Sequence, residues 1–358
     1  MNTAKIIAYY LPQFHPVPEN DKWWGTGFTE WTNVGRAKPL FKGHYQPRVP
    51  ADLGYYDLRL PKIRKQQAEM AQYAGIEGFC YWHYWFAGKR LLEQPFNEII
   101  QTGTPDFPFC LAWANESWTG VWNNDHKRIL IEQTYPGRED VIKHFYANLQ
   151  AFKDSRYIKV EGRIVFVIYK PLNLPNAKEF IDLWNNLAVQ NGLQGFYFIA
   201  VSTNPTYEVD KILSLGYDAV NVYNLKDVIN KTSIFSRINK GISRKFFAGR
   251  LSLTKYEYEE IIENWINGRD YQENIIPTIL PQWDNSPRSG RRAIIINNST
   301  PNKFDKHVKS MLNLVSEKEN KLLFLKSWNE WAEGNYVEPD LRYGKGYVDV
   351  LRKNLLAN

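Results

Sequence analysis

Short apolar runs alternate with helical segments along most of the chain. Eight of these runs have the length and composition of buried strands. In chain order they are Lys5–Gln13, Ile76–Tyr84, Phe109–Ala114, Arg163–Tyr169, Phe196–Ser202, Ala219–Asn224, Ile275–Leu280 and Leu322–Leu325. Apolar residues at helical spacing predict helices at Leu60–Ala74, Ala177–Asn191, Lys255–Asn267 and Lys303–Glu317.

This alternation predicts an α/β fold with a parallel sheet and crossover helices. Eight strand units favour a closed (β/α)8 TIM barrel over an open sheet, and no GxGxxG of a dinucleotide-binding fold follows the first strand. No repeat or low-complexity linker divides the chain, so we expect one domain over residues 1–358. The first βα loop, Phe14–Arg59, is unusually long, as functional loops are, and Leu225–Arg250 is basic and less regular.

Polar and aromatic residues follow the predicted strands. Because the carboxyl ends of all strands in a barrel meet at one face, where active sites form, these residues are expected to surround one pocket. They include Gln13, His15, His83, Trp85, Trp113, Asn115, Glu116, Tyr169, Lys170, Tyr223, Asn224, Trp283, Asp284, Trp328, Asn329, Glu330 and Glu333.

The segment Lys321–Gly334, KLLFLKSWNEWAEG, carries the strongest chemical signal. A buried strand leads directly into Glu330 and Glu333, which lie beside Trp328 and Trp331. Two carboxyl groups, one a proton donor and the other a base or nucleophile, are what glycosidic-bond chemistry requires. The alternative is a surface turn with solvated acids, and the spacing leaves open whether the two carboxylates face each other.

The remaining candidates each have two interpretations. Glu116, in the segment Asn115–Trp118, either contacts a substrate or caps a helix. His83 either contacts a substrate or is a packed core histidine. Glu30 and Trp31 lie in the long first loop and are candidates for substrate binding. We expect Trp31, Trp113, Trp118, Trp283 and Trp328 to stack on sugar rings, with Glu30, His83, Asn115, Glu116, Tyr169, Tyr223, Asp284 and Asn329 as further substrate-binding candidates.

Composition changes this interpretation little. The chain has 44% hydrophobic and 23% charged residues, typical of a globular protein, and its 13 Trp and 22 Tyr suit sugar rings but equally suit cores and interfaces. The net charge of +7 is not concentrated in a run of Lys and Arg, and no nucleic-acid-binding motif is present. We therefore expect no nucleic-acid partner; attraction to an anionic membrane face or an acidic glycan remains open.

Other chemistries lack their sequence signals. The chain has no HExxH, no Cys/His cluster with zinc spacing, no GxSxG and no P-loop, so we expect neither a metal nor a cofactor. Cys80 and Cys110 lie in apolar runs and are expected to be reduced core residues. The chain shows no signal-peptide core and no run of 18 apolar residues, which predicts a cytoplasmic location with at most peripheral membrane association.

Four segments carry a resemblance to a known family: Ala8–Arg59, Gly78–Glu98, Leu111–Trp122 and Ser327–Asp340. They resemble the WbsX-type proteins, glycoside hydrolase family 99-like domains encoded with bacterial surface polysaccharide genes. The resemblance extends over about Lys5–Arg352. It implies a (β/α)8 barrel that acts on O-antigen or capsule glycans.

The resemblance also implies roles for the two glutamates. Family 99 enzymes are retaining endo-acting enzymes that work without metal, and their E-W-x-E element matches Glu330–Glu333. This correspondence makes Glu330 the base on the sugar 2-hydroxyl and Glu333 the general acid/base. We expect a retaining hydrolase acting on a surface polysaccharide or its lipid-linked precursor; a glycosyltransferase or transglycosylase and a non-catalytic glycan-binding barrel are the alternatives.

Overall fold

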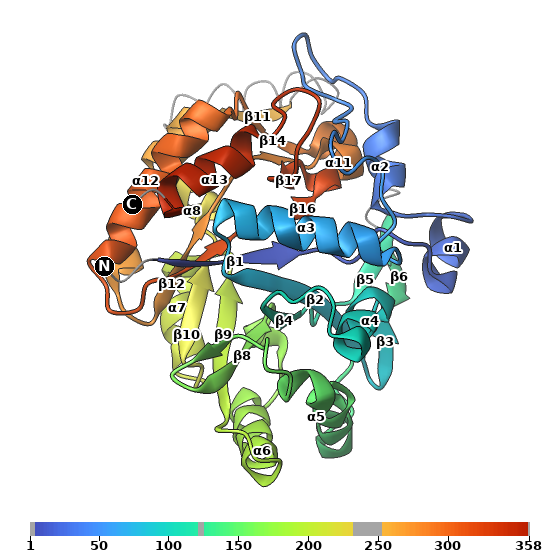
Figure 1. Ribbon diagram of the computed structural model, residues 1–358, viewed down its shortest axis with the longest axis vertical. Coiled ribbons are helices and arrows are strands. Elements are labelled where there is room, and N and C mark those ends of the chain that lie inside the picture. Colours follow the sequence, from blue (N-terminus) through green and yellow to red (C-terminus); the bar gives the residue numbers. More distant parts are fainter. Residues whose placement is uncertain (1–3, 121–124, 232–252, 357–358) are drawn as a thin grey trace.

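The structure, a computed structural model, describes residues 4–120, 125–231 and 253–356. Eight parallel strands form a closed barrel (Figure 1), which confirms the predicted (β/α)8 fold. The strands are β1 (Lys5–Tyr10), β2 (Gly78–Phe86), β4 (Phe109–Trp113), β8 (Arg163–Ile168), β9 (Phe196–Ser202), β10 (Ala219–Val222), β12 (Ile275–Ile279) and β15 (Leu322–Leu325).

The first strand closes the barrel. β1 pairs with β15 on one side, Ile6 opposite Leu323, and with β2 on the other, Ala8 opposite Phe79. The strands are rich in Val, Ile, Leu and aromatic residues and are buried almost throughout, as strands covered on both faces of a parallel sheet are.

Helices surround the barrel. In Figure 1, α3 lies across β1 and β2, with α12 and α13 nearby, while α5 and α6 lie together on the opposite side. The helices are α1 (Pro18–Trp24), α2 (Glu30–Arg36), α3 (Pro61–Ala74), α4 (Gln94–Thr102), α5 (Arg138–Phe152), α6 (Ala177–Gln190), α7 (Pro205–Leu213), α8 (Leu225–Lys231), α10 (Tyr258–Glu263), α11 (Ser286–Ser289), α12 (Pro301–Ser316) and α13 (Gly346–Leu356).

Shorter strands and turns lie outside the eight strands of the barrel. The short strands are β3 (Lys89–Leu91), β5 (Trp118–Gly120), β6 (Asp125–Ile131), β7 (Lys159–Val160), β11 (Thr254–Glu257), β13 (Trp283–Asp284), β14 (Ile294–Asn297), β16 (Asn329–Glu330) and β17 (Asn335–Tyr336). Single turns of 3-10 helix are η2 (Pro171–Asn173), η3 (Gly268–Tyr271), η4 (Gly290–Arg292) and η5 (Trp331–Glu333).

Two sequence predictions need correction. The helix predicted at Lys255–Asn267 is only the short α10, because the preceding residues pair as β11 with β14. The first loop is less irregular than expected, since it contains α1 and α2. The basic stretch Leu225–Arg250 begins as α8, and its remainder lies outside the described residues.

An aromatic layer fills the barrel interior below the mouth. The ring of Tyr9 lies 4.8 Å from the rings of both Trp82 and Phe324. The Tyr9 hydroxyl donates to Asn221 Oδ1 over 2.9 Å, and the Asn221 amide donates to Thr278 Oγ1 over 2.9 Å. These buried polar groups are therefore paired with one another, and the layer forms a rigid floor below the carboxyl ends of the strands.

Candidate active site

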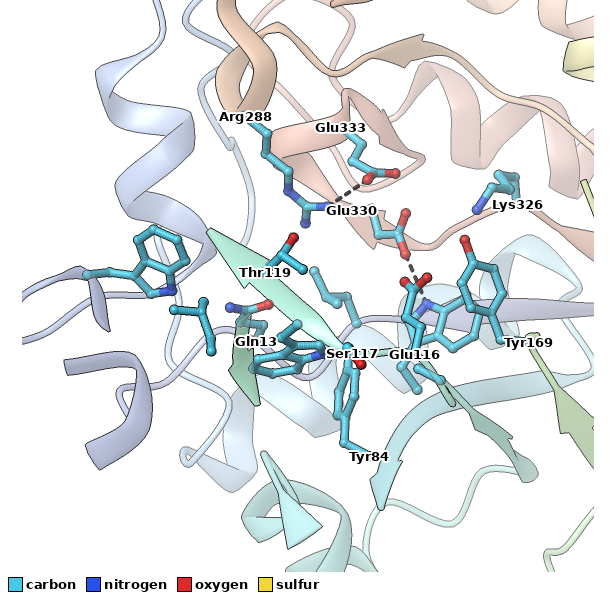
Figure 2. A pocket seen from close by; sticks show the side chains of 16 residues that line it. Gln13, Tyr84, Glu116, Ser117, Thr119, Tyr169, Arg288, Lys326, Glu330 and Glu333 are labelled. Carbon is cyan, nitrogen blue, oxygen red and sulfur yellow. Dashed lines mark hydrogen bonds and ion pairs between the residues drawn. The ribbon is translucent and has the colours of Figure 1, made fainter. Parts of the chain in front are cut away.

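A cavity of about 300 Å³ opens at the carboxyl ends of the strands (Figure 2). Its walls come from the ends of β1, β2, β4, β8 and β15, from β5 and β6, and from α11. The lining residues are Leu11, Gln13, Trp24, Trp82, Tyr84, Ala114, Glu116, Ser117, Trp118, Thr119, Leu130, Tyr169, Arg288, Lys326, Glu330 and Glu333.

Glu330 and Glu333 face each other in this cavity, which resolves the question that their spacing left open. Glu330 precedes the single turn η5 and Glu333 ends it. Both carboxyl groups line the cavity, and they lie close enough for each to shift the pKa of the other. Gly334 ends the turn at φ 55°, where a Cβ atom would lie 2.9 Å from atoms of Arg48 and Asp284.

The two carboxyl groups differ in their electrostatic surroundings. Burial, reinforced by the nearby Glu333, raises the pKa of Glu330 to about 8 despite the opposing charge of Lys326. Burial would also raise the pKa of Glu333, but the charges of Arg288 and Lys326 and the hydrogen bonds from Glu330 and Arg288 lower it below 4.5. Near neutral pH the pair therefore holds one proton, on Glu330.

Arg288, on α11, fixes the ionised member of the pair. Its Nη1 donates to Glu333 Oε1 over 2.6 Å, drawn as a dashed line in Figure 2. Its Nη2 donates to both oxygens of Glu30 at 2.9 Å, and Glu30 also accepts the backbone N–H of Ala332 over 2.8 Å. Glu30 is 0% exposed, so it positions Arg288 and the η5 backbone and does not reach the cavity.

Glu330 and Glu116 have donors of their own. The indole N–H of Trp82 lies 2.9 Å from Glu330 Oε1. The Nζ of Lys170 lies 3.7 Å from Glu116 Oε2. Burial raises the pKa of Glu116, an effect that Lys170 opposes and Glu333 reinforces.

A buried acid that the sequence analysis missed, Glu338, holds the η5 segment in place. Its carboxylate accepts the indole N–H groups of Trp328 and Trp331 at 3.0 and 2.7 Å, the amide of Gln67 at 2.7 Å and the hydroxyl of Tyr56 at 2.9 Å. Burial raises the pKa of Glu338 to about 7, although these hydrogen bonds lower it. Both tryptophans beside the carboxyl pair are thus buried structural anchors.

Of the residues predicted from the sequence, six line the cavity. They are Gln13, Glu116, Trp118, Tyr169, Glu330 and Glu333. Tyr223 and Trp283 lie behind this wall, and their rings are 5.1 and 5.8 Å from Lys326 Nζ.

The other predicted residues take structural positions. His83 is buried and hydrogen-bonded to His144 over 2.8 Å, and burial lowers its pKa well below 6.5. Trp113 packs against His144 and Phe180. Trp31 packs on Phe14 and Trp331. None of the three lines the cavity, so the structure favours the core interpretation for His83 and removes Trp31 and Trp113 as sugar platforms.

Three further candidates hold backbone or side chains. Asn115 bonds the backbone N–H and C=O of Lys170, and Asn329 bonds those of Leu11. Asp284 accepts His44 Nε2 at 2.8 Å and Gln46 Nε2 at 2.7 Å. Burial would raise the pKa of Asp284, but these bonds and the charge of Arg48 bring it to about 2. Asp284, Asn115, Asn329 and Trp328 therefore support the site and do not line it.

The sequence analysis left Trp82, Tyr84, Arg288 and Lys326 out of the site. In β2 every residue is buried, so the sequence gives no sign of which alternate residues point inward. His83 and Trp85 point outward and Trp82 and Tyr84 point into the cavity. Lys326 did have a signal, since it is the charged residue directly after an apolar strand; Arg288 had none.

Among the described residues, no group of three or more His, Cys, Asp or Glu side chains is arranged to hold a metal ion. The described helices include none that is both long and apolar enough to cross a membrane.

Comparisons with known proteins agree with this architecture. Residues 6–351 match the family described as Glycosyltransferase WbsX. A relative from Xanthomonas campestris pv. campestris (strain B100), the uncharacterized protein WxcX, is 35% identical over 358 residues, which cover 98% of this chain and 50% of the relative. The chain thus spans about half the length of the curated relatives it matches.

Two solved structures share the fold at low sequence identity. A glycoside hydrolase-like protein superposes with a TM-score of 0.64 at 15% identity, covering 99% of this chain and 94% of that chain. The GH99 endo-alpha-mannosidase from Bacteroides thetaiotaomicron gives a TM-score of 0.58 at 14% identity, covering 98% and 96%.

Proposed function

The chain belongs to the WbsX glycosyltransferase family, and from that premise we propose that it is a glycan-active enzyme whose reaction is carried out by Glu330 and Glu333. The observation that carries the proposal is the carboxyl pair itself: two glutamates share one proton in a cavity walled by Trp82, Trp118 and Tyr169. A proton donor beside a carboxylate, with aromatic faces for sugar rings, is the equipment of glycosidic-bond chemistry.

The proposed reaction follows from the protonation states. Glu330 donates its proton to the glycosidic oxygen as the bond to the anomeric carbon breaks. Glu333, held as a carboxylate by Arg288, acts as the base or nucleophile that stabilises the developing charge on the sugar. An inverting pair holds a water between carboxyl groups about 6.5–9.5 Å apart, whereas the carboxyl groups of a retaining pair lie closer together. The mutual interaction of Glu330 and Glu333 supports a retaining reaction.

This order of roles is the reverse of the one implied by family 99, in which the first glutamate is the base. Arg288 is the physical reason, because a guanidinium bonded to Glu333 opposes protonation of that residue. The two orders make different predictions. A variant without its acid still cleaves a glycoside with an activated aryl leaving group, because such a leaving group needs no proton, whereas a variant without its base does not.

A glycosyltransferase or transglycosylase is the second candidate, and the family description favours it. In transglycosylation the same pair breaks the donor bond, and a sugar hydroxyl takes the place of water in the second half of the reaction. As part of the proposal, the substrate is a bacterial surface polysaccharide or its lipid-linked precursor, met by this single catalytic domain at the cytoplasmic membrane face. The resemblance to the surface-polysaccharide family and the net charge of +7 support this part.

The test is mass spectrometry of lipid-linked and surface glycans after incubation with the purified protein, with and without nucleotide sugars. Shorter fragments with new reducing ends, absent with Glu330→Gln and with Glu333→Gln, are the expected result for a hydrolase. Longer products, lost in the same variants, would establish transfer. Turnover that survives both substitutions overturns the assignment of the pair, and unchanged glycans in every arm would favour a non-catalytic glycan-binding barrel.

The assignment of roles is tested with an activated aryl glycoside of the sugar that the first experiment identifies. We expect Glu330→Gln to retain cleavage of the aryl glycoside and Glu333→Gln to lose it. The opposite result would restore the order that family 99 implies.

A further inference from the structure

One wall of the cavity carries a lysine whose ammonium makes no direct contact with a carboxylate of the described residues. Lys326 follows β15 and lines the cavity beside Tyr169 (Figure 2). Its ammonium lies 5.1 Å from the ring centre of Tyr223, 5.8 Å from that of Trp283 and 6.0 Å from that of Tyr9. Within the described ranges Lys326 makes no ion pair and donates no hydrogen bond to a protein acceptor.

The aromatic groups behind Lys326 supply further polar atoms that have no partner in the described part of the chain. The hydroxyl of Tyr223 and the indole N–H of Trp283 are buried and have no hydrogen-bond partner among the described residues. The two rings lie 5.9 Å apart. They shield the ammonium from water on one side, so its three N–H donors are left to whatever occupies the cavity.

The carboxyl groups that line the cavity already have hydrogen-bond or ion-pair partners. Glu333 has Arg288, Glu330 has Trp82, and Glu116 has Lys170 at its edge. The charges of Glu330 and Glu333 reach Lys326 only at longer range. Lys326 thus differs from Arg288, the other cation that lines the described cavity, because it contacts no carboxylate directly.

We propose that Lys326, backed by Tyr223 and Trp283, forms a subsite for the carboxylate of an acidic sugar residue. The proposal rests on the proposed function for the ligand being a glycan. Sugar hydroxyls donate to the carboxyl groups of the cavity, while the sugar carboxylate accepts a charge-assisted hydrogen bond from Lys326, and such a bond is stronger than a neutral one. One ammonium matches one negative charge, which favours a carboxylate over a doubly charged phosphate, and the net charge of +7 favours an anionic ligand in general.

The test compares acidic and neutral sugars that are otherwise alike. Methyl glucuronoside is paired with methyl glucoside, and methyl galacturonoside with methyl galactoside, in ligand-observed NMR titrations of the full chain. We expect at least one uronoside to bind about tenfold more tightly than its neutral counterpart, the gain of one charge-assisted hydrogen bond. Lys326→Met should abolish that preference without weakening binding of the neutral sugar, and Lys326→Arg should preserve it.

Lys170→Met is the matched control, because it removes a second lysine from the barrel mouth and should keep the preference. The proposal is overturned if no uronoside binds more tightly than its neutral counterpart, or if the preference survives in Lys326→Met. Thermal unfolding checks that the variants fold; if Lys326→Met does not, Lys326→Gln replaces it and must likewise lose the preference.

This experiment measures equilibrium binding, so its result can contradict the proposed subsite without contradicting the proposed reaction. Turnover that depends on Glu330 and Glu333 without a uronoside preference would overturn only the subsite. A preference that depends on Lys326, with turnover indifferent to both glutamates, would overturn only the proposed reaction.

Discussion

Arg288 Nη1 donates a 2.6 Å hydrogen bond to Glu333 Oε1, and both side chains are largely buried, 14% and 21% exposed. An ion pair in such surroundings interacts more strongly than one in water, because little solvent screens it. The bond joins α11 to η5, segments that are separate in sequence and meet only at the barrel mouth. It makes Glu333 the ionised member of the pair.

Removal of this bond should shift the acid side of the activity profile. Arg288 lowers the pKa of Glu333, so Arg288→Met raises it, and a carboxylate needed for the reaction is then lost at higher pH. We expect the acid limb of kcat/KM to move upward by about one pH unit or more. Arg288→Lys should move it less, and an unchanged limb in both variants would show that the ionisation of Glu333 does not limit the reaction.

The alkaline side of the profile should report Glu330. Its pKa is raised to about 8, and a proton donor is active only below its pKa, so kcat/KM should fall as pH rises through about 8. The measurement is the wild-type pH profile from pH 6 to 10. Glu338→Gln is the control, because it removes the other buried acid of raised pKa and should leave the alkaline limb in place. An alkaline limb that shifts or disappears in Glu338→Gln would contradict the assignment of Glu330 as the acid.

Glu338 should couple stability to pH. Its folded-state pKa of about 7 exceeds the ordinary 4.5. Its contribution to the free energy of unfolding is therefore fully present below pH 4.5 and is lost as pH rises through 7. A shift of this size corresponds to about 3 kcal/mol. Urea unfolding at pH 4.5 and pH 8 measures how much the free energy of unfolding changes between the two pH values. This change should be smaller in Glu338→Gln than in the wild type by about that amount.

The same substitution should lower stability in absolute terms. A glutamine amide cannot accept from all four donors around Glu338, and each buried donor left unpaired costs about 1–3 kcal/mol. Glu69→Gln, on the exposed face of α3, is the matched control and should change the free energy of unfolding by less than about 0.5 kcal/mol. Equal stability of the two variants would show that Glu338 does not anchor η5.

The aromatic residues should separate into two classes. Trp118 lines the cavity, so Trp118→Ala should weaken glycan binding about tenfold while leaving the unfolding midpoint little changed. Trp328 is fully buried and donates to Glu338, so Trp328→Phe should lower the midpoint because Glu338 loses one of its four donors. Titration calorimetry and thermal unfolding of both variants check this division; a reduced affinity in Trp328→Phe at full stability would place that indole in the cavity after all.

Gly334 should tolerate no side chain. Its φ of 55° disfavours other residues, and an added Cβ would meet Arg48 and Asp284 at 2.9 Å. We expect Gly334→Ala to lower both the unfolding midpoint and kcat, because the turn that aligns Glu330 with Glu333 must shift. Gly43→Ala is the control, at a glycine of φ 82° with open space around it. It measures the loss of stability caused by the positive φ alone, without a steric clash of the added Cβ.

The sequence predicted the barrel because parallel strands buried on both faces are continuous apolar runs, and eight such runs are visible. The predicted ends differ from the observed ones by a few residues, as at Lys5–Gln13 and β1. The helix predicted at Lys255–Asn267 was wrong because its first residues pair with β14, and no local sequence pattern indicates this contact.

The candidate site was predicted less completely, for the same kind of reason. Glu330 and Glu333 stood out because charged residues directly followed a buried strand. The sequence does not show which face of β2 points into the barrel, because both faces are apolar. His83 was therefore predicted as a site residue and Trp82 was not. Arg288 is positioned by Glu30, 258 residues away, and such a partnership exists only in the folded chain.

The closure of the barrel by its first strand affects how the molecule acquires its site. β1 pairs with β15, and the backbone N–H of Leu11 is held by Asn329, 318 residues further along the chain. Contacts this distant in sequence form late and slowly, because the intervening chain must first be brought together. During synthesis, the carboxyl pair therefore remains unaligned until almost the whole barrel has emerged, and a partly folded chain has the two glutamates without the cavity that surrounds them in the folded protein.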